Sequence, residues 1–242
     1  MNLTWLGQAG YYLVSPGGLR IMIDPYLSDA LRRAQGEDFL REVPIDPAWC
    51  QAETDVLVIT HCHADHMDFE TLDCLLLRDH PVSVLAPLNV WQILRARYGG
   101  AHNYIQFDHG IEVSIGDVLF CSVFAAHSDE RAIGILLQSP DCVLYHTGDT
   151  LCHRRIFEEI DRRVNALLLP INGQGNNMNA VDAARFTRRI QPDLVLPMHF
   201  DMFRKFGCGV GDFYAQFTAD EQKKILVPEH YKEYCLWFGE SK

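Results

Sequence analysis

The sequence has no hydrophobic run of the roughly 18 residues that a membrane-spanning helix requires. We also expect no signal peptide, because the first residues contain neither a basic stretch nor an apolar segment. None of its eight cysteines forms a Cys-x-x-Cys pair, and several lie inside apolar runs, which is typical of buried free thiols. We therefore expect a cytoplasmic protein with reduced cysteines and no membrane partner.

Positive charge is also scarce. The chain has 21 Lys and Arg residues against 32 Asp and Glu residues, a formal net charge of −11. A surface that binds nucleic acid needs clustered cations, so we expect no nucleic-acid partner. A bound pair of divalent metal ions would reverse this acidity locally, which leaves room for a small anionic substrate.

No linker, repeat or low-complexity tract divides the 242 residues. Strand and helix patterns alternate in both halves, with an antiparallel meander predicted over 111–138 between them. This order predicts one layered α/β domain over residues 1–242. Residues 28–50, with mixed charges and two prolines, predict a surface loop or short helix that could cover a site. The predicted helices span 69–78, 88–98, 152–163, 180–190 and 211–224, and the last predicted strand spans 234–238.

Residues 60–68 contain three imidazoles and a carboxylate within six positions, directly after the apolar run 55–59. That run predicts a buried strand. A hydrophobic core gains nothing from groups that titrate near neutrality, whereas nitrogen and oxygen donors this close together suit a divalent metal ion. The alternative is a solvated histidine-rich turn. The candidate ligands are His61, His63, Asp65 and His66.

Three more polar residues follow predicted strands in the same way. His127 follows strand 118–125, Asp149 follows strand 142–145, and His199 follows strand 194–196. In layered α/β folds, ligands bind at the carboxyl ends of the strands. We therefore expect these three side chains to join the cluster.

The pattern His61-x-His63-x-Asp65-His66, followed by His127, Thr-Gly-Asp149 and His199, resembles the metallo-β-lactamase superfamily of hydrolases. The resemblance implies a four-layer αββα sandwich with two metal ions at one edge. It also implies that Asp149 bridges the two ions and that Asp24 orients ligand histidines from behind. By the same resemblance, the first ion is held by His61, His63 and His127, and the second by Asp65, His66 and His199.

Within the superfamily, residues 170–185 and 197–202 are similar to the L-ascorbate-6-phosphate lactonase branch. Antibiotic-degrading lactamases typically carry a cysteine where this chain has Asp149, and flavodiiron oxidoreductases carry an acid where it has His63. Asp149 therefore disfavours an antibiotic-degrading lactamase, and His63 favours hydrolysis over oxidoreductase chemistry. The lactonase resemblance also implies a homo-oligomer.

The expected chemistry is attack by a hydroxide shared between two metal ions, Mn²⁺ or Zn²⁺, with Asp149 bridging them and Asp65 able to relay a proton. We expect this hydroxide to open a sugar-phosphate lactone. The alternatives are a metal-dependent phosphodiesterase and a non-catalytic, metal-containing binding protein.

The polar loop after the predicted strand 166–169 is a candidate for binding a substrate anion, because amide side chains donate hydrogen bonds and glycine lets the backbone approach closely. The alternative is an ordinary strand-to-helix loop. Its candidate residues are Asn172, Gln174, Asn176 and Asn177. Candidate cations for a phosphate, each with a solvated helix position as its alternative, are Arg154, Arg155, Arg185, Arg204 and Lys205.

Overall fold

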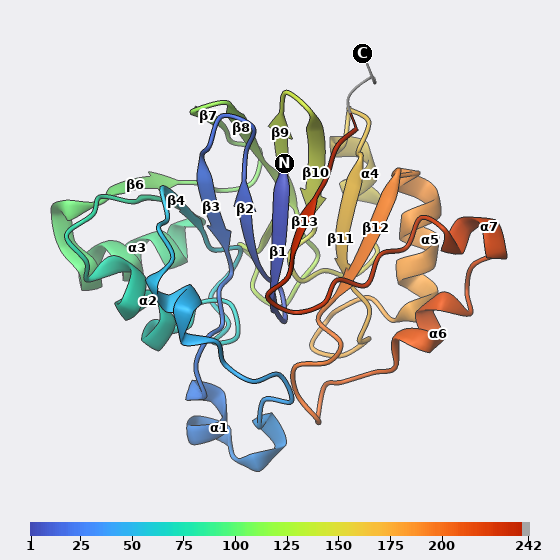
Figure 1. Cartoon of the computed structure of the whole chain (residues 1–242), viewed down its shortest axis with the longest axis horizontal. Coiled ribbons are helices and arrows are strands. Elements are labelled where there is room, and N and C mark those ends of the chain that lie inside the picture. The colour runs from blue at the N-terminus through green and yellow to red at the C-terminus, as the bar shows by residue number, and fades with distance from the viewer. Residues whose placement is uncertain (239–242) are drawn as a thin grey trace.

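The computed structural model describes residues 1–238, and its strands form two mixed sheets (Figure 1). Antiparallel hairpins open the first sheet, and parallel pairing from the third to the sixth strand continues it. Across this seven-stranded sheet the order is β13 (Glu233–Cys235), β1 (Asn2–Gly7), β2 (Gly10–Val14), β3 (Arg20–Ile23), β4 (Val56–Val58), β5 (Ser83–Ala86) and β6 (Asn103–Gln106).

The second sheet contains the antiparallel meander that the sequence predicts over 111–138, and two parallel strands extend it. Across this six-stranded sheet the order is β12 (Leu194–Met198), β11 (Ala166–Pro170), β10 (Cys142–His146), β9 (Ile133–Ser139), β8 (Val118–Phe124) and β7 (Glu112–Ile115).

Helices cover the outer face of each sheet, which gives the predicted four-layer αββα sandwich (Figure 1). On the first sheet, α2 (Phe69–Leu76) and α3 (Leu88–Tyr98) bury Leu72 and Leu94 in one cluster with Leu57 of β4. On the second sheet, α4 (Arg154–Glu159) contacts β8 and α5 (Ala180–Ile190) contacts β11. The remaining helical segments are α1 (Ala30–Gln35), α6 (Val210–Tyr214), α7 (Ala219–Gln222) and the 3₁₀ turns η1 (Glu37–Phe39), η2 (Pro47–Gln51) and η3 (Gly99–Ala101).

Inner strands of the first sheet, such as β3 and β4, are apolar on both faces because both faces are buried. In β4, Val56 and Val58 belong to the core between the sheets, while Leu57 belongs to the core under the helices. In β3, Ile23 and Met22 divide in the same way. Strands covered on both faces are therefore continuous apolar runs, which is why the run 55–59 reads as a buried strand.

Some element predictions need correction. The single helix predicted over 211–224 is two short helices, α6 and α7, because the Thr218 side chain accepts a hydrogen bond from the Glu221 backbone N–H and starts a new helix. Strand β6 was not predicted, and the last strand ends at Cys235. The helix predicted from Asn179 is confirmed, with the Asn179 side chain accepting from Asp182 N at 2.9 Å. Residues 239–242 of the predicted domain lie outside the described residues.

None of the helices within residues 1–238 combines the length and the apolar character needed to cross a bilayer.

Candidate metal centre

The directions of the strands bring their polar end residues to one edge. β1 and β3 run the same way because each is antiparallel to β2, and β4 is parallel to β3. In the second sheet, β8 and β10 share a direction because both are antiparallel to β9, and β11 and β12 are parallel to β10. The segments that follow these strands therefore meet at the same end of the sandwich, as the sequence predicts.

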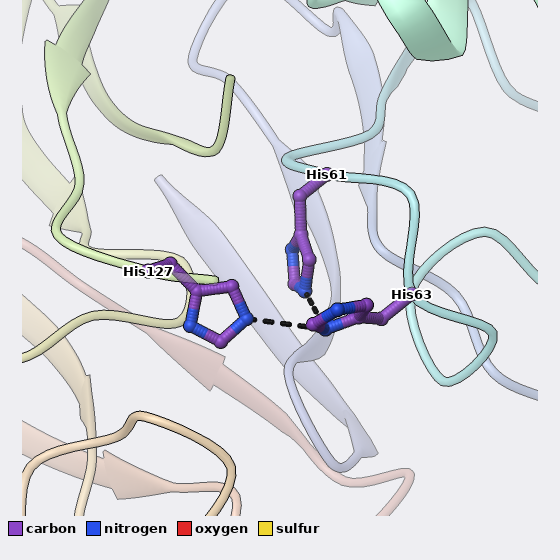
Figure 2. A group of neighbouring side chains, drawn as sticks. All are labelled: His61, His63 and His127. Carbon is purple, nitrogen blue, oxygen red and sulfur yellow. Dashed lines mark hydrogen bonds between the residues drawn. The ribbon is translucent and has the colours of Figure 1, made fainter. Parts of the chain in front are cut away.

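His61, His63 and His127 form the first group of potential ligands. Figure 2 shows the three rings turned toward one another, two from the loop after β4 and His127 from the loop after β8. Nδ1 of His63 lies 3.0 Å from Nε2 of His61 and 3.1 Å from Nε2 of His127. Three imidazole nitrogens around one point are a donor set typical of zinc-type metal sites. This is the trio predicted for the first metal ion.

Asp65, His66 and His199 form the second group, beside the first. Nε2 of His199 lies 3.3 Å from Oδ2 of Asp65. Asp149 contacts both imidazoles, with Oδ1 at 3.3 Å from Nε2 of His66 and Oδ2 at 3.1 Å from Nε2 of His199. The ring centroids of His61 and His66 are only 4.0 Å apart, so the two groups are contiguous. All seven side chains singled out in the sequence thus lie in one cluster.

Asp24 lies behind the cluster, fully buried after β3. Its Oδ2 is 2.7 Å from Nδ1 of His66, and its Oδ1 accepts a hydrogen bond of 2.7 Å from the backbone N–H of Thr60. The Thr60 hydroxyl donates to the same carboxylate. A carboxylate on Nδ1 fixes the imidazole tautomer and directs the lone pair of Nε2 outward. Asp24 therefore occupies the orienting position that the resemblance implies.

Burial favours the neutral form of two histidines in the first group, His61 and His127. It lowers the pKa of His61 well below the ordinary value, and the neighbouring His66 adds to that effect. Burial lowers the pKa of His127 as well. Neutral imidazoles keep a free lone pair, so both rings are in the form that binds a metal ion.

In the second group, burial and charge act in opposite directions. Burial alone would lower the pKa of His199, but the Asp149 and Asp65 carboxylates raise it to about 9. Burial alone would raise the pKa of Asp149, yet His199 and His66 lower it well below the usual range. The carboxylates therefore attract cations strongly, and a divalent ion competes with the imidazole protons for them.

The residues present fit a metal ion. Nε2 of His66 and Oδ1 of Asp149 are buried, and neither has a hydrogen-bond partner among the described residues. Buried polar atoms in folded proteins are almost always paired, so this orphaned pair is explained by an ion that takes a lone pair from each. The imidazole and carboxylate donors suit Mn²⁺ and Zn²⁺.

Comparison with known proteins agrees with this geometry. The family described as a beta-lactamase superfamily domain matches residues 19–200, a range that contains all seven candidate ligands. The chain belongs to this superfamily. The match covers most of both sheets and both ligand groups, and it confirms the superfamily predicted from the histidine pattern.

Individual relatives match between 84% and 100% of the chain. A UPF0173 metal-dependent hydrolase from Koribacter versatilis is 28% identical over 217 residues, which is 84% of this chain and 85% of the relative. Another from Pyrococcus furiosus is 27% identical over 253 residues, which is 100% of this chain and 98% of the relative. Igni18, a novel metallo hydrolase from Ignicoccus hospitalis, has the same fold, with a TM-score of 0.78 at 20% identity over 96% of this chain and 97% of that chain. These matches support the superfamily and the fold. The assignment to the lactonase branch stays a prediction.

Gln8 belongs to the site although the sequence analysis assigned it no role. Its Nε2 donates to Oδ2 of Asp65 at 2.8 Å and lies 3.0 Å from Nε2 of His199. The one signal that could have identified it is position, since it follows β1 at the same edge as the predicted ligands. Gln8, Asp24 and His199 all have left-handed φ angles, of 53°, 43° and 61°. Non-glycine residues adopt such angles rarely, and they cluster where a site needs them.

The histidine just before the Asp149 turn is structural. Nε2 of His146 donates to the carbonyl of Ala9 at 2.9 Å, and its Nδ1 accepts from the backbone N–H of Gly148 at 3.1 Å. Both ring nitrogens are therefore used to hold the turn that presents Asp149, and His146 is not part of either ligand group.

A cavity of about 370 Å³ opens onto the cluster and is lined by His63 of the first group and by Asp65, Asp149 and His199. Leu31 of α1 also lines it, so the segment 28–50 covers the site as predicted. In Figure 1, α1 projects beyond the strands on that side. The loop after β11 contributes all four predicted amide residues to the cavity: Asn172, Gln174, Asn176 and Asn177.

The candidate cations for a phosphate lie elsewhere. Each one is paired with a carboxylate on the surface, and none of them lines the cavity. The pairs are Arg154–Glu158, Arg155–Glu159, Arg185–Asp182, Arg204–Glu42 and Lys205–Asp38. The alternative role of these residues, as solvated surface positions, is the one that the structure supports.

Proposed function

We propose that this protein is a metal-dependent hydrolase that cleaves a small carboxylic ester, with a lactone as the first candidate. The observation that carries the proposal is the position of Asp149, whose two carboxylate oxygens face His66 and His199 beside a separate trio of imidazoles. Three nitrogens on one side and a mixed nitrogen and oxygen set on the other are suited to two ions. The names of the UPF0173 relatives support the hydrolase assignment.

Each ion has its ligands in this arrangement. His61, His63 and His127 would hold the first, and Asp65, His66 and His199 the second, with Asp149 between them. Two divalent ions so held would supply a hydroxide at neutral pH and would polarise the scissile carbonyl oxygen. Mn²⁺ and Zn²⁺ are both compatible with these donors, because no thiolate is present in either ligand group within residues 1–238.

The side chains around the ions position the reacting groups. Hydrolysis forms one bond from water oxygen to the acyl carbon and breaks the bond from that carbon to the ring oxygen, which leaves as an alcohol after gaining a proton. Asp65 borders the cavity and is the group suited to pass that proton. Gln8 donates to one oxygen of Asp65, and Asn177 donates to Oδ2 of Asp149 at 2.9 Å. These two amides hold the carboxylates in place.

The lactone comes from the resemblance to the L-ascorbate-6-phosphate lactonases, which also makes a sugar-phosphate lactone part of the proposal. From the same resemblance we also propose that the protein forms a homo-oligomer.

The test is hydrolysis of a panel of lactones and phosphodiesters by protein loaded with Mn²⁺ or Zn²⁺. We expect lactone opening, measured as proton release. The activity should fall by roughly 10³-fold or more in His61→Ala and in Asp149→Ala, since His61 would hold the first ion and Asp149 lies between the two. His109→Ala is the matched control, because His109 pairs with Glu159 on the surface. Cleavage of phosphodiesters alone would make the protein a phosphodiesterase. Metal binding with no hydrolysis at all would make it a binding protein.

A further inference from the structure

The cavity beside the metal centre has one apolar wall. Leu31, Phe39, Phe203 and Phe206 form it, from α1, η1 and the loop after β12. The ring centroid of Phe39 lies 5.7 Å from that of Phe203 and 5.4 Å from that of Phe206, so the aromatic rings support one another. Phe203 also packs against the buried ring of Tyr26 at 5.5 Å. The wall is therefore already formed in this structure and offers aromatic surface to a ligand.

Amide side chains also line the cavity, and one of them, Asn172, is buried without a hydrogen-bond partner among the described residues. The Asn177 side chain donates a hydrogen bond to Asp149 and accepts one from the backbone N–H of Thr150. Asn172 is only 7% exposed and lines the cavity, yet neither its Nδ2 nor its Oδ1 has a hydrogen-bond partner among the described residues. Gly173, with φ at +67°, turns the chain tightly against Asn179 and holds the loop in this position. Asn172 thus has an unpaired donor and an unpaired acceptor, both buried in the lining of the cavity.

No Lys or Arg lines this cavity within residues 1–238. Nζ of Lys205 lies 5.4 Å from the centroid of the Phe39 ring, and this ammonium group is paired with Asp38. A phosphate placed in the cavity away from the metal ions would lose its hydration against phenylalanine rings without gaining a cation. Burying a charge in this way is strongly unfavourable.

We infer that the substrate is an uncharged carboxylic ester or lactone with an aromatic or branched alkyl substituent, and that Asn172 hydrogen-bonds to a polar group on it. The apolar wall takes the substituent, and the amide distinguishes substrates that carry a donor or acceptor at its position. This inference rests on the proposed ester hydrolysis and replaces its sugar-phosphate substrate with a neutral one.

The test compares three lactones with the metal-loaded protein: γ-phenyl-γ-butyrolactone, unsubstituted γ-butyrolactone and a 6-phosphorylated sugar lactone. We expect kcat/KM for the phenyl compound to exceed that for the other two by about tenfold or more, since even one methylene in a fitted apolar pocket changes it by roughly that factor. Phe206→Ala should remove most of this preference, and Phe206→Leu should retain part of it. Phe206 is chosen because it is only partly buried, so its replacement does not open the core.

A second set of variants tests Asn172 by a readout that a structural role would not produce. Asn172→Leu replaces an unpaired buried amide with an apolar group of similar size, so the melting temperature should stay the same or rise. For a neutral lactone that carries a hydroxyl or amide substituent, kcat/KM should nevertheless fall about tenfold. Asn165→Leu is the matched control. Its amide is fully paired, with Val143 N and Asp193 Oδ2, so its melting temperature should fall while kcat/KM stays unchanged.

The outcomes separate the two proposals. If none of the lactones is opened while metal binding is intact, the ester hydrolase proposal fails. If lactones are opened but the phosphorylated one is preferred, and Lys205→Met abolishes that preference, the protein is a hydrolase and the neutral-substrate inference is wrong. Equal kcat/KM for the phenyl and unsubstituted compounds also overturns the inference. An unchanged kcat/KM in Asn172→Leu overturns the role of the amide.

Discussion

Oδ2 of Asp24 lies 2.7 Å from Nδ1 of His66, and both side chains are completely buried. This contact joins the end of β3 to the ligand loop after β4, and Thr60 holds the same carboxylate through its backbone and its hydroxyl. The orientation of His66 therefore depends on a residue that does not line the cavity.

Asp24→Asn should weaken metal binding about 10- to 100-fold while the fold remains. The asparagine amide places a donor against Nδ1 of His66, which moves the ring proton to Nε2 and blocks the lone pair that faces Asp149. Competition with a chelator measures the affinity. Asp117→Asn is the control, because Asp117 accepts from Ser15 and Gly17 in a surface turn at the opposite end of the strands. Equal affinities in the two variants would contradict the orienting role of Asp24.

Metal loading should stabilise the protein. An ion at a free concentration of 100 times its Kd adds about 2.7 kcal/mol to the free energy of unfolding, provided that the unfolded chain does not bind it. We expect the melting temperature to rise with Mn²⁺ or Zn²⁺ and to return to its starting value on chelation. In His127→Ala the rise should be smaller, since one ion loses a ligand. If added metal did not change the melting temperature of the unaltered protein, the assignment of this cluster as a metal site would be wrong.

Gly148→Ala should disturb the turn that presents Asp149. Gly148 has φ at +60°, and a Cβ there would lie 2.5 Å from the carbonyl oxygen of Ile133. We expect a loss of about 2–4 kcal/mol in stability together with weaker metal binding. Gly18→Ala is the comparison, because Gly18 has φ at +87° with no atom within 4 Å of the added Cβ. That variant should lose only about 1 kcal/mol and bind metal normally. Denaturant unfolding of both variants measures the difference.

Acid should remove the contribution that the Arg188–Glu221 pair makes to the stability of the fold. Arg188 hydrogen-bonds to Glu221, and with the Thr218 backbone N–H it lowers the pKa of that carboxyl from 4.5 to about 2. Because the folded-state pKa lies below the unfolded one, the stabilisation is complete above about pH 4.5 and disappears as the pH falls through about 2.

Glu221→Gln should therefore be less stable than the unaltered protein at pH 7, and the gap should close as the pH approaches 2. Urea unfolding at a series of pH values checks this. Glu158→Gln removes a carboxylate from an exposed pair with Arg154 and controls for the loss of a surface charge. A gap that is independent of pH would show that the capping contact, not the charge, is responsible.

Much of this architecture could be predicted from local patterns. Strands such as β4 are continuous apolar runs because the sandwich buries both of their faces, and the helix from Asn179 begins with a side-chain cap. Of the seven candidate ligands, four lie within six positions of sequence. His127, Asp149 and His199 could be added because each follows a strand, and strands of one direction end at one edge.

Other features depend on contacts between distant segments. Strand β6 has polar, exposed residues at both ends, since it is at the edge of its sheet, so no alternation or apolar run marks it. Gln8 is a single amide after a turn, and its role exists only through Asp65. The apolar wall combines Phe39 with Phe203, which pack together across more than half of the chain. No local pattern reports such a pairing.

The two sheets supply the ligand groups jointly. His61, His63, Asp65 and His66 follow a strand of the first sheet, whereas His127, Asp149 and His199 follow strands of the second. Neither half can therefore assemble either ligand set alone, and a chain whose sheets have docked in the wrong register cannot bring the candidate ligands together. We therefore expect the metal content of a purified sample to rise with its fraction of correctly assembled molecules, independent of any substrate.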